Sequence, residues 1–176
     1  MALHRLKHNA ETLVMETNPI RPTDDQAREL ARRLIAQMRH AALGTLDPES
    51  GIPLVTRIAV QADADGTPLA LLSGLAAHSR ALAADPRVGL LVTDDAAAKG
   101  DAMTHARLSI LAKAELAPPD PQRRDRWLAR DPKATVYIDL PDFRFWRLVP
   151  VSALLNGGFG RAFHIQPADM VKPPVA

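Results

Sequence analysis

Residues 71–92 read LLSGLAAHSRALAADPRVGLLV, and this stretch decides how the rest of the chain is interpreted. An apolar strand ends at Ser73, a short alanine-rich helix is expected over Ala76–Ala84, and Val88–Thr93 resumes as an apolar strand. Three polar side chains open the helix, namely His78, Ser79 and Arg80. Amides at a helix start, beside a hydroxyl and a guanidinium, can form an anion site; the alternative is an ordinary solvated helix with a serine near its cap.

The segments on either side predict a small β-barrel with flanking helices. Upstream, Thr23-Asp24-Asp25-Gln26 matches a capping box, and apolar residues follow at helical spacing as far as Met38. Turn residues then separate short apolar runs, which predict strands over residues 41–46, 52–60, 68–73, 107–116, 143–155 and 162–165. A further helix is expected over Pro121–Arg130, with Asp120 as its cap. About six strands at short spacing are typical of a small antiparallel barrel, so the fold class is mainly β.

Composition excludes several kinds of site and partner. The chain has 176 residues, 47% of them hydrophobic and 24% charged, which is typical of a globular domain. Its 22 Lys and Arg against 20 Asp and Glu leave a formal charge of only +2, so nucleic acid is not an expected partner. No metal site is expected, because cysteine is absent and the six His residues form no ligand motif. With neither a membrane-spanning run nor a signal-peptide core, the expected location is the cytoplasm, away from the membrane.

The aromatic residues are confined to the last third of the chain. One interpretation is that the C-terminal strands supply the bulky half of a core that is otherwise Ala, Leu and Val. The other is that some of these rings form the wall of a pocket for a planar ligand. The seven residues are Trp127, Tyr137, Phe143, Phe145, Trp146, Phe159 and Phe163.

Three motifs, in order, resemble the pyridoxamine 5′-phosphate oxidase-like superfamily of FMN-binding split barrels. Residues 85–92 (DPRVGLLV) are similar to the Asn/Asp-Pro-Arg-Val sequence that leads into an apolar strand in that family. The pair His78-Ser79 is similar to the haem-utilisation branch, typified by HugZ-like proteins, where such a pair replaces Arg-Lys. Residues 143–150 (FRFWRLVP) and 156–162 (NGGFGRA) look like the closing motif of the same branch. The resemblance extends from about residue 37 to residue 165 and implies a six-stranded antiparallel split β-barrel.

The resemblance also implies a homodimer with FMN at the subunit interface. In such a dimer, Arg57 would be presented to the phosphate, and the backbone of Ile58 and Ala59 would lie against the flavin ring. Leu72 and Ser73 would lie at the edge between the ring and the ribityl chain.

The remaining roles implied by the resemblance concern the phosphate and the mouth of the site. The phosphate would be held at the helix start, by His78, Ser79 and Arg80. Arg107 would place a polar side chain near the flavin, and Phe159 and Arg161 would line the mouth of the site. No residue is assigned as a catalytic acid or base.

The expected organisation is an N-terminal arm over residues 1–22, an FMN-binding split-barrel domain over 23–166, and a tail over 167–176. The tail has no Arg/His-bearing segment like that of the true pyridoxamine oxidases, so vitamin B6 oxidation is not expected. The sequence ends before the additional C-terminal domain that helps longer relatives to hold haem. Haem degradation is therefore not expected either, and haem stays a candidate ligand.

The leading hypothesis is an FMN-dependent oxidoreductase with a small-molecule redox substrate. This hypothesis includes a link to haem iron utilisation. One alternative is a non-catalytic flavin- or haem-binding protein that acts as a carrier, sensor or sequestration module. The other is a barrel that has lost its cofactor, because Ala77-His78 replaces a strongly basic pair.

Overall fold

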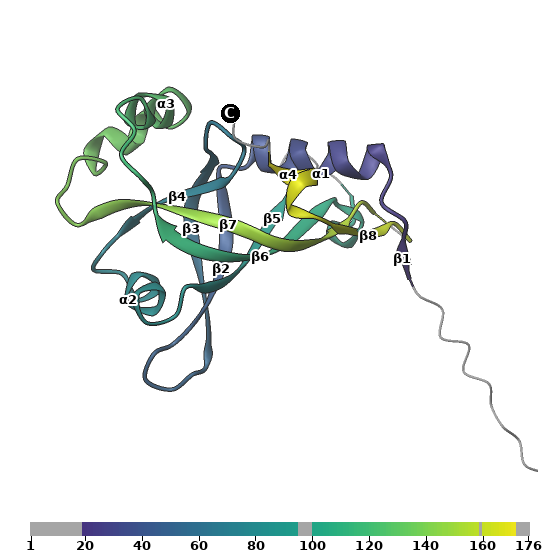
Figure 1. Ribbon diagram of the computed structural model, residues 1–176, viewed down its shortest axis with the longest axis horizontal. Helices are drawn as coiled ribbons and strands as arrows, with labels where there is room; N and C mark the ends of the chain where they lie inside the picture. Colours follow the sequence, from purple (N-terminus) through teal and green to yellow (C-terminus); the bar gives the residue numbers. More distant parts are fainter. Residues whose placement is uncertain (1–18, 95–99, 159, 172–176) are drawn as a thin grey trace, which may run out of the picture.

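The computed structural model of the chain describes residues 19–94, 100–158 and 160–171. Its centre is a closed antiparallel barrel of six strands in the order β7-β4-β3-β2-β5-β6, and β6 pairs with β7 to close the circle (Figure 1). The six strands are β2 (His40–Leu46), β3 (Pro53–Ala62), β4 (Pro68–Ser73), β5 (Arg87–Thr93), β6 (Arg107–Leu116) and β7 (Phe143–Asn156). The predicted fold class, a mainly β six-stranded split barrel with flanking helices, is confirmed.

The closure depends on the length of β7, which has 14 residues. Its first residues pair with β4, while the strand from Trp146 onward pairs with β6, with a bulge where the register shifts beyond Leu111. At its far end β7 also pairs with β8 (Ala162–Ile165), and β1 (Ile20–Arg21) adds to β8 in parallel. The last residues of the segment expected to be an arm are therefore part of the sheet.

Helix α1 (Asp25–Gln37) buries its apolar face against the barrel, with Leu34 and Ile35 almost fully enclosed. Its cap is Asp24, whose carboxylate accepts the Ala27 amide at 2.7 Å. The predicted capping box at Thr23 is wrong, because the Thr23 hydroxyl donates instead to the carbonyl of His164 in β8. The short helix α4 (Pro167–Met170), in the predicted tail, packs on α1 and buries Met170 in the same core.

The barrel interior is almost entirely aliphatic, and Phe163 is the one aromatic residue among its fully buried described members. Most of the other described rings form a second, smaller cluster on the outer face of β4 and β7. There Trp127 is 1% exposed and meets Phe145 edge-on, with ring centroids 5.4 Å apart. The aromatic residues therefore do not supply half of one core, as one interpretation held; they build a separate layer outside the barrel.

This outer layer is held by α3 (Arg123–Arg130) and the 3₁₀ helix η3 (Pro132–Val136), which connect β6 to β7. The helix begins two residues later than predicted, because Asp120 caps the preceding turn by accepting the Gln122 amide at 2.9 Å. Two other short helices lie at the barrel ends: α2 (Ala77–Ala84) follows β4, and the 3₁₀ helix η2 (Ala102–Thr104) precedes β6. No helix in the described ranges is both long and apolar enough to cross a membrane.

Candidate functional site

Helix α2 places its first turn against β3. The Nδ1 atom of His78 lies 3.1 Å from the hydroxyl of Thr56, and Nε2 of the same ring is buried without a polar partner among the described residues. Burial lowers the pKa of His78, so the neutral imidazole is favoured near neutral pH. The structure therefore places His78 as a packed, uncharged side chain at the base of the helix start.

The two serines of the predicted site use their hydroxyls within the protein. Ser79 is buried and donates to the carbonyl of Ser73 at 2.6 Å. The Ser73 hydroxyl donates to the Asp142 carboxylate at 2.5 Å and accepts the Leu75 amide at 3.2 Å. These bonds hold the turn between β4 and α2, and Ser79 can donate to a phosphate only if its hydroxyl leaves the Ser73 carbonyl.

Arg57 and Arg80 are the exposed cations of this region. Neither has a carboxylate within ion-pair distance among the described residues, and Arg80 reaches only the Leu75 carbonyl, at 3.5 Å. The Thr56–His78 hydrogen bond connects the two segments that carry them, because Arg57 follows Thr56 and Arg80 lies two residues after His78. The bond brings the two segments together, while strand alternation turns the Arg57 side chain to the face opposite Thr56.

The backbone adds further donors at the start of α2. The amides of Ser79 and Arg80 both point to the Ala76 carbonyl, at 3.0 and 3.4 Å. The amides of Ala77 and His78 have no protein partner among the described residues, as is usual in the first turn of a helix. Together with the two guanidiniums they form a donor set suited to an oxyanion.

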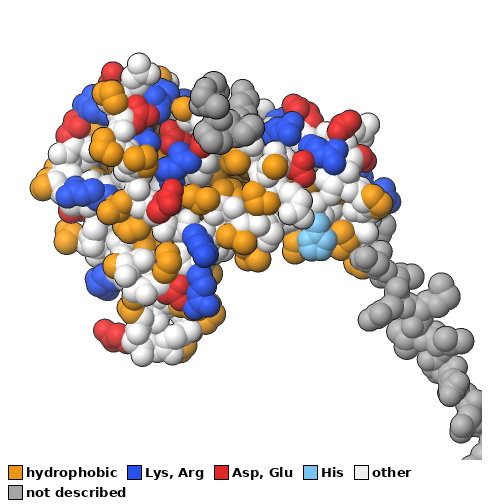
Figure 2. Space-filling model, viewed as in Figure 1, with side chains coloured by type: hydrophobic (Ala, Val, Ile, Leu, Met, Phe, Trp, Pro, Cys, Tyr) orange, Lys and Arg blue, Asp and Glu red, His pale blue; other side chains and the backbone are white. Residues whose placement is uncertain are grey.

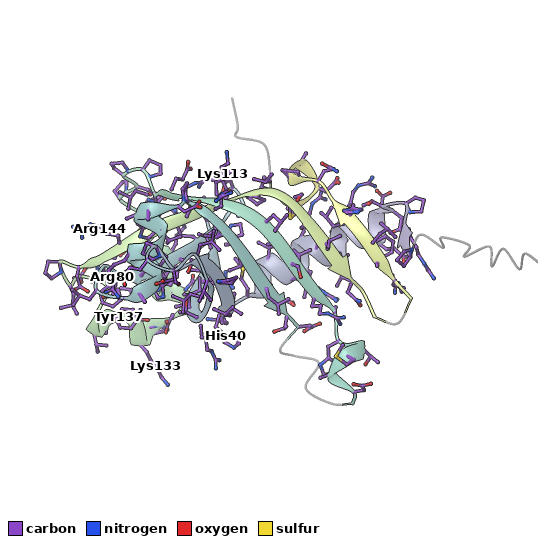
Figure 3. All side chains as sticks on the ribbon, turned by 90° about the horizontal axis from the view of Figure 1, so that it is seen from below. His40, Arg80, Lys113, Lys133, Tyr137 and Arg144 are labelled. Carbon is purple, nitrogen blue, oxygen red and sulfur yellow. The ribbon has the colours of Figure 1, made fainter. Side chains whose placement is uncertain are left out.

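Arg144 is a further cation that the sequence-based prediction did not include. It pairs with Leu72 across β7 and β4, and its guanidinium donates to the backbone carbonyls of Pro141 and Phe143. Figure 3 places Arg144 at the same end of the molecule as Arg80. The closing motif FRFWRLVP contained this residue, but the motif was interpreted for its fold and not for its charge.

Strand alternation divides the predicted site residues between two faces. Ile58 and Leu72 point into the barrel core, where both are less than 5% exposed. Arg57, Ala59 and Ser73 occupy the alternate positions, on the outer face. Side chains of the outer set can meet a ligand directly, whereas Ile58 and Leu72 can contribute only their backbone.

Arg107 lies away from α2. In the paired registers, Arg57 of β3 is level with Ser109 of β6, with β2 and β5 between them. Three strand spacings amount to roughly 14 Å, and Arg107 lies one outward-facing position beyond Ser109. Its guanidinium donates to the Met103 carbonyl at 3.0 Å. A single chain does not bring Arg107 into contact with Arg57.

Arg161 lies in the turn between β7 and β8, near the end of β7 that pairs with Arg107. Its backbone closes the turn, because its amide donates to the Gly158 carbonyl and its carbonyl accepts the Gly157 amide at 2.8 Å. Phe159, the other residue predicted at the mouth of the site, lies outside the described residues. The structure therefore places Arg107 and Arg161 together, apart from the α2 group.

An exposed apolar strip runs across the outer face of the barrel. Its large residues are between 39% and 67% exposed, and they are Val55, Leu91, Leu111, Val151 and Leu154. Gly44 and Gly89 pair within the strip and border a hollow of about 350 Å³. Figure 2 shows hydrophobic side chains gathered on this face, over β6 and β7. Exposed apolar surface of this kind marks a contact surface.

The fold and the motifs define a split-barrel protein, and comparison with known proteins identifies its family. Residues 27–155, more than half of the chain, match the family model described as pyridoxamine 5′-phosphate oxidase. This chain belongs to the pyridoxamine 5′-phosphate oxidase family.

Several similar proteins are described in terms of haem. The chain is 32% identical over 115 residues to the non-canonical heme oxygenase HOZ of the Arabidopsis thaliana chloroplast, covering 64% of this chain and 34% of that protein. A heme binding protein from Mycobacterium smegmatis superposes with a TM-score of 0.74 at 29% identity, covering 86% of this chain and 61% of that one. The protein Atu2129 of Agrobacterium tumefaciens, of unknown function, superposes with a TM-score of 0.75 at 36% identity, covering 86% and 62%.

The chain thus spans about a third of the length of its curated relative and about three fifths of the length of these two solved chains.

Proposed function

We propose that this protein binds FMN, with the phosphate at the start of α2, and acts as an FMN-dependent oxidoreductase. The observation that carries the proposal is the donor set of this region. Arg57 and Arg80 have no ion-paired carboxylate among the described residues, and the amides of Ala77 and His78 have no protein partner there. Charge-assisted bonds from guanidiniums and helix-start amides are what a phosphate requires. The Asp142 carboxylate opposes an anion in this region, and its bond from Ser73 reduces that effect only in part.

The flavin ring would lie on the outer face, against the backbone of Ile58 and Ala59 and beside Ser73. Bound flavin would supply the electron transfer, while the protein holds its phosphate and positions its ring. His78 would support the phosphate site as a neutral side chain braced by Thr56, and not as a charge. Ser79 would join the phosphate contacts after releasing the Ser73 carbonyl.

We further propose a homodimer built on the exposed apolar strip. Arg107 lies three strands and one outward-facing row from Arg57, and Leu91 and Leu154 of the strip share the row of Arg57 on the outer face. A two-fold contact is self-complementary, so it can bring the Arg107 end of one protomer to the α2 end of its partner. Burying the strip would also remove its apolar surface from water.

Haem binding without turnover is the second candidate, and the heme binding protein from Mycobacterium smegmatis supports it. The names of HOZ and of the Mycobacterium smegmatis protein both refer to heme. The two matches include 64% and 86% of this chain, respectively. A flat apolar face with nearby arginines is compatible with a large planar ligand that carries carboxylates.

The test compares FMN with riboflavin, which lacks the phosphate. FMN should bind the purified protein at least about tenfold more tightly than riboflavin, since the phosphate gains charge-assisted bonds. The double variant Arg57→Gln/Arg80→Gln should lose that preference and keep its riboflavin affinity, whereas Arg124→Gln on α3 should match the parent protein. Equal affinities for the two flavins in the parent protein would overturn the phosphate assignment.

Turnover separates the enzyme from the binding module. FMN-loaded protein should lose its oxidised flavin absorbance when mixed anaerobically with NADPH or NADH, and regain it with an electron acceptor. If neither change occurs and haem instead binds with a shifted Soret band, the non-catalytic haem-binding candidate is the better one.

A further inference from the structure

We propose that a hollow beside α3 is a binding site for a small organic molecule that carries a carboxylate or phosphate group. The hollow has a volume of about 280 Å³ and lies between α3 and the end of β3. Its wall is formed mainly by Gln61, Asp63, Leu69, Arg123, Trp127 and Arg130. None of these belongs to the predicted flavin site, so the inference stands apart from the proposed function.

The positive side of the hollow is Arg130, with Arg39 beside it. One terminal nitrogen of Arg130 (Nη2) donates to the carbonyls of Ala36 and Met38, at 2.7 and 3.5 Å, and so anchors the end of α1. Arg39 donates to the carbonyl of Arg130. The Nε and Nη1 groups of Arg130 have no partner among the described residues, and neither arginine has a carboxylate within ion-pair distance there.

Two neighbouring guanidiniums without a counter-charge create a positive potential that an anion would relieve. Burial, and then the charge of Arg39, lower the pKa of Arg130. An oxyanion that meets the free Nε and Nη1 groups would gain the parallel two-point contact that guanidinium makes with carboxylate and phosphate.

The acid in the wall does not neutralise this charge. Asp63 is 3% exposed at its side chain, and both of its oxygens are occupied. One accepts from Arg126 at 3.2 Å and from the Ala64 amide, and the other accepts from Arg123 and Arg147 at 3.2 and 2.8 Å. Burial alone would raise the pKa of Asp63, but the Ala64 amide and the guanidiniums outweigh it and hold the pKa below its usual value. The carboxylate is therefore fully used by the protein.

Two donors in residues of the same wall, the Nε atom of Arg123 and the Nε1 atom of Trp127, have no hydrogen-bond partner among the described residues. The two residues are 6% and 1% exposed, and both nitrogens have less than 1 Å² of accessible surface. They therefore face the protein interior, and the anion contact in the hollow depends on Arg130. Leu69 and the indole of Trp127 add apolar surface, which suits an organic group next to the anion.

Tryptophan fluorescence can test the site in the full chain. The sequence has two tryptophans, so a Trp146→Phe background leaves Trp127 as the sole reporter. Phosphate and benzoate are titrated separately at constant ionic strength, with chloride as the reference salt. At least one of the two should give a saturable change, and chloride should give none. Saturation by phosphate alone or by benzoate alone supports the site and identifies the anionic group; saturation by neither overturns it.

Matched arginine variants assign the signal to this hollow. Arg130→Gln should weaken binding by about tenfold or more, and Arg130→Lys should restore part of it because charge returns without the fork geometry. Arg39→Gln should also weaken binding while leaving the contacts of Arg130 with α1 intact, so a folding defect cannot explain both results. Arg124→Gln, on the same helix but bound to Asp139, is the control. Unchanged binding in Arg130→Gln and Arg39→Gln would overturn the assignment.

The double variant Arg57→Gln/Arg80→Gln keeps the two proposals distinguishable. It should leave the anion response of Trp127 unchanged while it removes the preference for FMN. Loss of the Trp127 response in that variant would place the anion at α2 instead and would overturn the hollow as its site.

Discussion

At the start of α2, Arg57 and Arg80 face no carboxylate within ion-pair distance, whereas around α3 three arginines share the single carboxylate of Asp63. The first region is exposed, and its nearby acids, Asp47 and Asp142, form no ion pair with Arg57 or Arg80 among the described residues. The second is partly buried, and Figure 2 shows positive and negative side chains intermixed over it.

The difference separates two uses of arginine in one small domain. A buried guanidinium needs a partner, because an unpaired charge away from water is costly. Around α3 the partners therefore hold the outer layer to the β3–β4 turn and to β7, through Asp63 and through Asp65 at 2.7 Å from Arg147. Arg130 is the exception in that region, and for this reason it is the residue on which the proposed anion site depends.

The largest expected effect is on the paired region. Asp63→Ala should lower the free energy of unfolding by about 3–5 kcal/mol, because it leaves the buried guanidinium of Arg123 without its nearest carboxylate. Arg126 and Arg147 keep the carboxylates of Asp120 and Asp65. Urea denaturation at pH 7 measures the change. Asp125→Asn, whose side chain is 82% exposed, should cost less than about 0.5 kcal/mol. If Asp63→Ala lowers the free energy of unfolding as little as Asp125→Asn does, the ion pairs around α3 contribute no more than surface ion pairs.

At the start of α2 a smaller loss is expected from Ser73→Ala. The variant removes the bond to the Asp142 carboxylate and the acceptor of the Leu75 amide, which together stabilise the turn by about 1–2 kcal/mol. Ser109→Ala, at an exposed position of β6, should change the midpoint of urea denaturation by less than the error of the measurement. If the two serine variants behave alike, the turn is not held by its side chains.

Acid should weaken the α2 region through His78. The pKa of His78 is lower in the folded protein than its ordinary value, so the unfolded chain takes up the proton first as the pH falls. The contribution of neutral His78 to the free energy of unfolding is fully present above a pH of about 6.5. It decreases as the pH falls from there to the pKa of His78 in the folded protein. Unfolding curves between pH 7.5 and 5 should show this slope, and His78→Gln should flatten it. An equal slope in both proteins would remove His78 as the cause.

The smallest effect on the isolated chain is expected in the exposed apolar strip, which includes Leu91 in the same row of the barrel as Arg57. A Cβ added at Gly89 would meet no atom within 4 Å, so Gly89→Ala should alter the stability of the monomer by less than about 0.5 kcal/mol. In the proposed homodimer the added methyl group would clash with the partner subunit. The dimer of the variant should therefore have a higher dissociation constant in sedimentation experiments. An unchanged association constant would argue that the strip is not the contact surface.

Local patterns predicted most of the fold. The bounds expected for the strands Pro68–Ser73, Arg107–Leu116 and Ala162–Ile165 are those of β4, β6 and β8, because turn residues delimit each run. The errors at the two helix starts have different causes. Thr23 bonds to His164, 141 positions away, and such a distant partner leaves no trace in a local pattern. Asp120 has a local partner, because it caps the turn before α3 by accepting the Gln122 amide.

The candidate site was predictable in part. The motif around His78 located the helix start, but it did not show that the Nε2 atom of His78 is buried or that the Ser79 hydroxyl donates to Ser73. Arg144 was missed because its position beside β4 depends on the pairing of strands some 70 residues apart in the chain. The roles of all these residues toward FMN remain predictions.

The sequence by itself determined most of the strands and helices and the family of this protein, since apolar alternation, turn residues and short motifs act over a few neighbours. It did not show β1 or α4, which form on partners far along the chain. Tertiary structure decided which charges are paired. Asp63 meets Arg123, Arg126 and Arg147 only because the barrel closes and α3 folds back over its outer face. A carboxylate attracts any cation that lies close to it in space, whatever their separation in the sequence. Arginine is therefore a structural partner at α3 and a free donor at α2.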